Sequence, residues 1–278
     1  MFREALAARN VSVRVMSDNR GVGTLPNRPP LELGLGSLVW LQTMGNLGLT
    51  LRDGSPLSNV FGPGADLALA GGLVLLASLA LATPLPRPLR ASTAASLASV
   101  MLLITAIETT RFGHFASWVA PLAHAIRFVA PAALAGLLWG ASARAVSLGL
   151  RVGAGAVFIG HGIECLLGHP TFIAYLTRVP RDWLGFGPSA ELAGSLLTGI
   201  GVLDIVVGAA LLVRAPRPVL AWTGFWGLLT ALVRVLYLGL VGWPDALIRI
   251  TNGGVPALLL RAGAARLFRC EEPAESRP

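Results

Sequence analysis

The residues of this chain best suited to chemistry lie in one short run, His161-Gly-Ile-Glu164-Cys165-Leu-Leu-Gly-His169. On a helix, residues i, i+4 and i+8 share one face, so His161, Cys165 and His169 could align, with Glu164 beside them. Imidazole and thiolate groups bind soft metals and haem. A histidine beside a carboxylate inside a membrane can also be structural, or can bind a substrate, a quinone or a proton.

Two features of this run argue against a metal. Gly168 and Pro170 are expected to end the helix before His169 is held in place. A di-iron bundle would need Glu-x-x-His pairs from two helices, and these are missing from the sequence. We therefore expect no metal, no cofactor and no catalytic residue, and instead a hydrogen-bonded His161 and Glu164 paired with Arg234 or Arg249. A substrate, quinone or proton site built from the same residues is the alternative.

The composition identifies the environment in which these residues must work. The chain has 278 residues, of which 54% are hydrophobic and 13% charged, and its mean hydropathy is +0.68. A soluble domain carries about 25% charged residues, so the class of ordinary soluble domains is excluded. Two distant cysteines, Cys165 and Cys270, exclude a disulfide scaffold. The remaining class is an all-α, multi-pass membrane protein.

Eight apolar segments are long enough to be examined as membrane spans. A helix rises about 1.5 Å per residue and needs roughly 20 residues to cross a lipid core, and backbone groups in lipid must be bonded within the segment. We therefore predict eight transmembrane helices, at Gly34–Leu51, Ala65–Ala82, Ser92–Thr110, Trp118–Gly140, Ala145–Gly168, Ala190–Val213, Val219–Val241 and Ala246–Arg266.

The arginines give an independent test of this topology. The chain has no lysine, and its net charge of +8 comes from arginines that lie mostly between the apolar runs. This distribution favours membrane topology over nucleic-acid binding. With eight spans, fifteen arginines fall on the side of both termini and four on the other side, which places both termini in the cytoplasm.

A repeated pattern predicts two similar four-helix bundles. Trp118 precedes Pro131 by the same spacing as Trp243 precedes Pro256, and Pro-Arg-Pro occurs before an apolar helix at 86–88 and again at 216–218. We expect a cytoplasmic tail at 1–33, halves at 34–141 and 142–268, and a second tail at 269–278. Met16 is an alternative start to Met1.

The ionisable residues inside the spans are expected to share one polar cluster, because charges in lipid usually face a bundle interior and pair. By helical rise, His124, His161 and Arg234 lie at matched depths, about 10 Å from one surface. The predicted ligand-binding or polar cluster comprises His161, Glu164, Asp204, Arg234, Arg249 and His124.

The connection after this cluster is also patterned. Residues Phe172, Ile173, Tyr175 and Leu176 suit a short helix lying on the membrane surface. The bulky residues Trp183, Phe186 and Trp243 are expected to act as anchors at the membrane interface.

The second half, residues 145–262, resembles the DoxX/DoxD-like family of four-helix membrane proteins. The resemblance is carried by Arg151-Val-Gly-Ala-Gly-Ala-Val-Phe-Ile-Gly-His161-Gly, by Glu191-Leu-Ala-Gly-Ser and by Gly201-Val-Leu-Asp204-Ile-Val-Val-Gly208. It implies a bacterial inner-membrane bundle, sometimes a subunit of a quinone-linked redox complex. This chain is about twice the four-helix length and has no Cys-x-x-Cys.

Two functions are therefore expected from the sequence. The first is a non-catalytic membrane subunit or binding protein with a redox-complex partner and no nucleic-acid partner. The alternative is a small-solute or lipid transporter that uses the intramembrane polar cluster.

Overall fold

The chain folds into a bundle of helices. The computed structural model describes residues 30–53, 63–110 and 115–269, and in these ranges it contains no β-strand. The long helices are α1 (Pro30–Asp53), α3 (Pro63–Leu81), α4 (Arg87–Thr109), α6 (Ala125–Trp139), α7 (Ala143–Leu166), α8 (Pro170–Leu184), α9 (Ala190–Val213), α10 (Arg217–Leu238) and α12 (Ile250–Arg269). The short ones are η1 (Ser117–Val119), α5 (Ala120–Ala123), η2 (Gly239–Gly242) and α11 (Trp243–Leu247).

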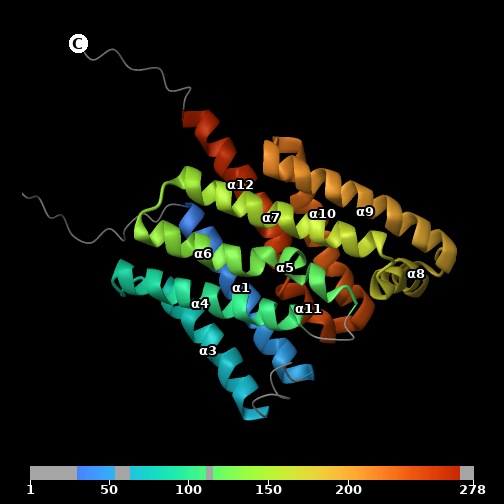
Figure 1. Ribbon diagram of the computed structural model, residues 1–278, viewed down its shortest axis with the longest axis horizontal. Helices are drawn as coiled ribbons and strands as arrows, with labels where there is room; N and C mark the ends of the chain where they lie inside the picture. The colour runs from blue at the N-terminus through green and yellow to red at the C-terminus, as the bar shows by residue number, and fades with distance from the viewer. Residues whose placement is uncertain (1–29, 54–62, 111–114, 270–278) are drawn as a thin grey trace, which may run out of the picture.

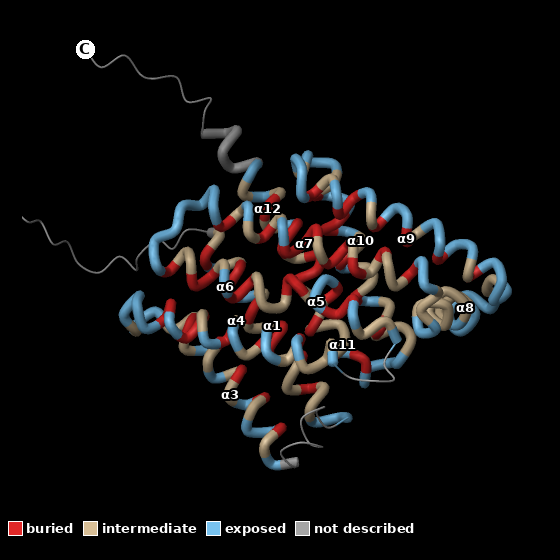
Figure 2. The backbone as a smooth tube through the Cα atoms, viewed as in Figure 1, coloured by how far each residue is buried: buried red, intermediate tan, exposed pale blue. Residues whose placement is uncertain are grey.

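Helices α4, α6, α7 and α9 run side by side in that order, and α8 lies beside the ends of α7 and α9 (Figure 1). Helix α1 packs against α3, α6, α11 and α12, so it lies inside the bundle. Buried positions gather along the contacts of α1, α6, α7 and α12, whereas the outer faces of α3 and α9 are exposed (Figure 2). The exposed face of α9 is rich in leucine and valine, and that of α3 carries Leu67 and Leu75, as expected for surfaces that contact lipid.

Six helical segments are long and apolar enough to cross a membrane, which supports a multi-pass membrane protein. They are Gly64–Leu81, Arg87–Thr109, Ser117–Trp139, Ala143–Leu166, Ala190–Val213 and Arg217–Leu247. All eight predicted segments are helical, but α1 and α12 are not among these six. Their polar side chains are bonded inside the protein: Thr251 donates to Gln42 at 2.8 Å, and Gln42 donates to the Arg127 carbonyl at 2.9 Å.

Two predicted spans differ in detail from the helices observed. The segment Trp118–Gly140 is interrupted at His124, where α5 ends and α6 begins. The last segment begins as α11 and restarts as α12 at Ile250. Helix α1 starts at Pro30, inside the predicted tail. Residues 1–29, including Met16, and residues 270–278 lie outside the described residues.

A buried ion pair joins the first helices of the bundle. Arg90 of α4 lies 2.6 Å from Glu32 of α1, and its Nε donates to the Ala80 carbonyl of α3 at 2.9 Å. Both side chains are buried, so each supplies the partner that the other needs in a low dielectric. These contacts of Arg90 connect α1, α3 and α4.

Candidate functional site

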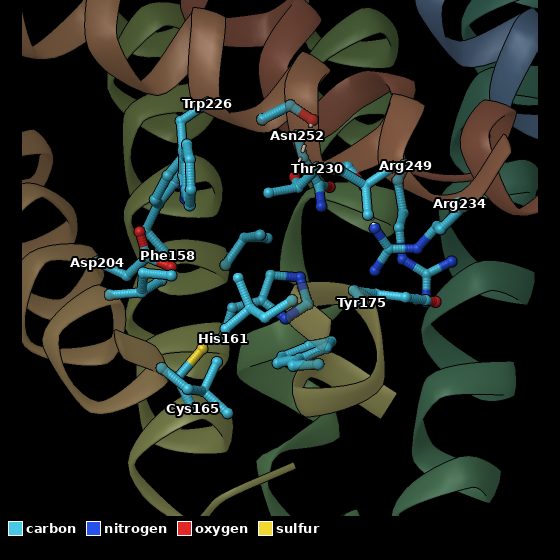
Figure 3. Close-up of a pocket in the computed structure, with 17 residues that line it drawn as sticks. Phe158, His161, Cys165, Tyr175, Asp204, Trp226, Thr230, Arg234, Arg249 and Asn252 are labelled. Carbon is cyan, nitrogen blue, oxygen red and sulfur yellow. Dashed lines mark hydrogen bonds between the residues drawn. The ribbon is translucent and has the colours of Figure 1, made fainter. Parts of the chain in front are cut away.

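A cavity of about 130 Å³ lies between α7, α9, α10 and α12, beneath the first turns of α8 (Figure 3). Its walls are mainly apolar, with Val157, Phe158, Leu197 and Trp226 among them. Small-molecule sites have this character, with a few polar groups set in an apolar lining. The polar lining comes from His161, Asp204, Thr230, Arg234, Arg249 and Asn252.

His161 enters the cavity from α7 and is oriented by Glu164. The Nδ1 atom of His161 lies 2.8 Å from Oε2 of Glu164, one turn further along the helix. Because Nδ1 is engaged, Nε2 is the ring nitrogen left for a ligand in the cavity. Glu164 itself does not line the cavity. The carboxylate of Glu164 therefore orients the imidazole of His161 from outside the cavity.

Arg234 enters from α10 and is 4% exposed. Its Nη1 donates to the carbonyl of Thr230 on the preceding turn, and its guanidinium lies 5.5 Å from the centre of the Tyr175 ring on α8. No hydrogen-bond partner for its Nε occurs within the described residues. A buried cation that is only partly satisfied is an unusual feature, since buried charges normally have full sets of partners.

Arg249 lies at the interruption between α11 and α12. Its Nη1 donates to the Asp245 carbonyl at 3.2 Å and lies 3.9 Å from the Asp245 carboxylate. That carboxylate is held more closely by Arg52 of α1, at 2.7 Å. The Nε of Arg249 has no hydrogen-bond partner in the part of the chain that the structure describes. Figure 3 shows Arg249 and Arg234 next to each other at one side of the cavity.

Asp204 lies across the cavity from the two arginines, on α9 (Figure 3). It is 5% exposed, and its Oδ1 makes no hydrogen bond to any described residue. Trp226 of α10 lies near it on the same side of the cavity (Figure 3). The cavity thus has a cationic side and a single carboxyl on the opposite side.

His124 belongs to a second cavity rather than to this one. That cavity has a volume of about 310 Å³ and lies between α1, α3, α4 and the interruptions before α6 and α12. In it, His124 lies 2.7 Å from Glu108. Arg249 lines both cavities.

The geometry tests the predicted pairing directly. The structure brings His161, Asp204, Arg234 and Arg249 to one cavity and places Glu164 behind His161. The predicted hydrogen bond between His161 and Glu164 is present, at 2.8 Å. The further pairing of these two residues with Arg234 or Arg249 is wrong, because among the described residues Arg249 pairs with Asp245 and no carboxylate pairs with Arg234. The physical reason is reach, since residues three apart on a helix are direct neighbours.

Sequence reasoning missed several lining residues. Trp226, Thr230 and Asn252 carry no charge and therefore gave no signal inside apolar runs. Tyr175 was placed on a surface helix, and α8 does begin there, but the helix extends to Leu184 and its first half covers the cavity. The signal available in the sequence was the amphipathic pattern of Pro170–Leu184, which has an apolar face along the length of the helix.

The aligned metal-ligand arrangement does not occur. Helix α7 ends at Leu166, and His169 instead begins α8, where its Nδ1 accepts from the Thr171 N–H at 3.2 Å. Its ring stacks on Phe172 at 4.4 Å and contacts Phe115 at 4.7 Å between ring centres. Within residues 30–53, 63–110 and 115–269, no three His, Cys, Asp or Glu side chains converge as a metal site would require.

Comparisons of this chain with protein-family models, with curated proteins and with solved structures give no match.

Proposed function

We propose that this protein is a non-catalytic, membrane-embedded binding protein whose ligand is an amphiphilic molecule held in the cavity beneath α8. One observation carries the proposal: an apolar cavity inside a membrane-type bundle is lined by the buried side chains of Arg234 and Asp204, and the Nε of Arg234 and the Oδ1 of Asp204 have no hydrogen-bond partner among the described residues. A ligand with one polar end and one apolar part would satisfy both kinds of lining.

The proposal includes the finer topology. We propose eight spans, with α1 and α12 as the two additional ones, in two related four-helix halves at 34–141 and 142–268. Both termini then lie in the cytoplasm of a bacterial cell, with the protein in the inner membrane. Support comes from the arginine distribution and from the internal hydrogen bonds that satisfy the polar residues of α1 and α12. Reporter tags at the two ends should both report a cytoplasmic location.

The resemblance to the DoxX/DoxD-like family adds a partner to this proposal. It implies that the binding protein works as a subunit beside a redox or quinone system. Capture of the tagged protein in mild detergent should then recover a redox enzyme of the same membrane. Recovery of the chain alone would remove the partner from the proposal and leave the binding function.

The direct test is to fill the cavity. Ile200→Trp on α9 would place an indole where a ligand is expected, because Ile200 lines the cavity. Val202→Trp on the same helix is the matched control, since Val202 is 53% exposed on the outer face. The full chain, purified in mild detergent, is analysed by native mass spectrometry for a co-purifying molecule. We expect the ligand to be lost from Ile200→Trp and kept by Val202→Trp; equal retention in both would overturn the proposal.

One observation favours transport as a second candidate. Arg249 lines both cavities, so the two cavities approach each other at this residue. A transporter would carry its solute from one cavity to the other. Uptake of a labelled amphiphile into vesicles containing the protein, abolished by Glu164→Gln, would favour transport over binding alone.

A further inference from the structure

We infer that the ligand beneath α8 carries a negatively charged head group, a carboxylate or a phosphate, held between Arg234 and Arg249. The inference rests on the proposed binding function and adds the chemical class of the ligand. It follows from the charges that face the cavity and from the partners that those charges lack.

The two arginines have too few anionic partners. Arg234 is hydrogen-bonded to a backbone carbonyl and lies over the Tyr175 ring, and neither of these carries a negative charge. Among the described residues, the carboxylate that pairs with Arg249 is the distant one of Asp245, at 3.9 Å, and it is already engaged by Arg52 at 2.7 Å. Glu164 is engaged by His161 at 2.8 Å. Among the described residues, the cavity therefore holds two cations without a carboxylate of their own.

Their position makes an anion the favoured complement. The guanidinium groups lie side by side in Figure 3, and like charges in a low dielectric repel each other. Each also has an Nε–H without a partner in the described part of the chain. A carboxylate or phosphate offers several acceptor oxygens, which suit guanidinium donors better than a single neutral carbonyl does. One anion would thus offset the repulsion and accept from both arginines.

The rest of the lining sets the orientation of the molecule. Asp204 on the far side offers no positive charge to an anionic group, so the head is directed to the arginines (Figure 3). Phe158, Leu197 and Trp226 then line the space for the apolar part of the ligand. A quinone also has an apolar tail, but its neutral head would leave both cations uncompensated. The structure therefore favours an anionic amphiphile over a quinone.

The experiment compares probes that differ only in the head group. The full chain in a neutral detergent is titrated with dodecyl phosphate, dodecanoate and dodecanol, and with a decyl-substituted benzoquinone, while its thermal unfolding is followed. We expect the two anionic probes to raise the unfolding temperature and to bind at least about tenfold more tightly than dodecanol or the quinone. Inorganic phosphate alone should give no comparable shift, because it lacks the part that fills the apolar lining.

Variants assign the effect to the two arginines. Arg234→Gln and Arg249→Gln should each weaken dodecyl phosphate binding by about tenfold or more, and Arg234→Lys should recover part of that loss because it keeps the charge. Arg127→Gln is the matched control: it removes a cation that lines only the other cavity. If Arg234→Gln does not fold, Arg249→Gln carries the test.

The outcomes separate this inference from the proposed function. Equal binding of dodecanol, the quinone and dodecyl phosphate, or unchanged binding in both glutamine variants, would overturn the anionic head and leave amphiphile binding standing. Protection by inorganic phosphate as strong as by dodecyl phosphate would leave the anion site standing and overturn the amphiphilic ligand of the proposed function, since the apolar part would then contribute nothing. Binding of no probe, combined with no effect of Ile200→Trp on co-purified material, would overturn the proposed function itself.

Discussion

At the scale of single residues, Glu164 is a positioning residue for His161. Its carboxylate lies 2.8 Å from Nδ1 of a ring that lines the cavity. Glu164→Ala would leave that partly buried nitrogen without a partner, and we expect it to destabilise the fold by about 1–3 kcal/mol. Glu191→Ala, at the exposed first turn of α9, is the control and should be near neutral. Thermal unfolding of both variants in detergent measures the difference; equal unfolding temperatures would show that the pair contributes nothing.

His169 gives the molecule a local dependence on pH. Burial of its ring against Phe115 and Phe172 lowers the pKa of His169, and its Nδ1 must be unprotonated to accept from Thr171. The nearby carboxylate of Glu164 opposes this by raising the pKa, but burial is the larger effect. Because the pKa of His169 is lower in the folded protein than in the unfolded segment, the unfolded segment binds a proton at a higher pH than the folded protein does. Stability at the start of α8 is therefore complete above about pH 6.5 and is lost as the pH falls below that value.

The measurement is amide hydrogen exchange over Pro170–Leu184 at pH values from 8 to 5, corrected for the intrinsic rate. We expect protection of the first turn of α8 to fall in the acidic half of this range. His169→Asn keeps a side-chain acceptor at the N-cap without titrating, so its protection should stay level. The same acid loss in His169→Asn would assign the effect to another group.

At the scale of elements, α8 is a helix held over the cavity by few contacts. Tyr175 lies 5.5 Å from the Arg234 guanidinium and packs edge-on against Tyr237, and Trp183 donates to the Leu236 carbonyl at 2.9 Å. A desolvated cation–π contact contributes roughly 0.5–2 kcal/mol. Tyr175→Leu should therefore speed amide exchange in α8 by about threefold to thirtyfold. Tyr175→Phe keeps the ring and should exchange like the natural protein; similar acceleration in both variants would contradict the role of the ring face.

The elements also show what the sequence could and could not predict. All eight apolar segments are helices, and the end of α7 before His169 follows from Gly168 and Pro170, because hydrophobic length and helix-breaking residues are local signals. The interruption at His124 has no such signal, since apolar residues continue on both sides of it. Part of the site was predictable as well, because Arg234, Arg249 and His161 are ionisable residues within apolar segments. The pairing of Glu164 with His161 was also predictable, since residues three apart on a helix are neighbours, whereas the separation of His124 into a second cavity depends on tertiary packing.

At the scale of the whole molecule, each of the two proposed halves contacts the interrupted helix of the other through a glycine. A Cβ added at Gly160 of α7 would lie 2.9 Å from the Leu122 carbonyl carbon, next to the end of α5. A Cβ added at Gly45 of α1 would lie 2.9 Å from the Leu247 carbonyl carbon, at the end of α11. Leu122 and Leu247 are related by the spacing that relates Trp118 to Trp243 and Pro131 to Pro256. These reciprocal contacts support the proposed repeat, in which each half would be completed by the other.

If this exchange of contacts holds the two halves together, both glycines should be sensitive to the smallest possible side chain. A methyl group at either position meets backbone atoms, which cannot rotate away as a flexible side chain would. We expect Gly45→Ala and Gly160→Ala each to destabilise the protein by about 1–3 kcal/mol, the typical cost of overpacking. Gly194→Ala on α9 is the control, because an added Cβ there meets nothing within 4 Å, and alanine favours the helix. Thermal unfolding should thus be lowered by the first two substitutions and left unchanged or raised by the third. If only one of the two glycines is sensitive, the halves are not held together reciprocally, because a symmetric contact requires the same close approach at both positions.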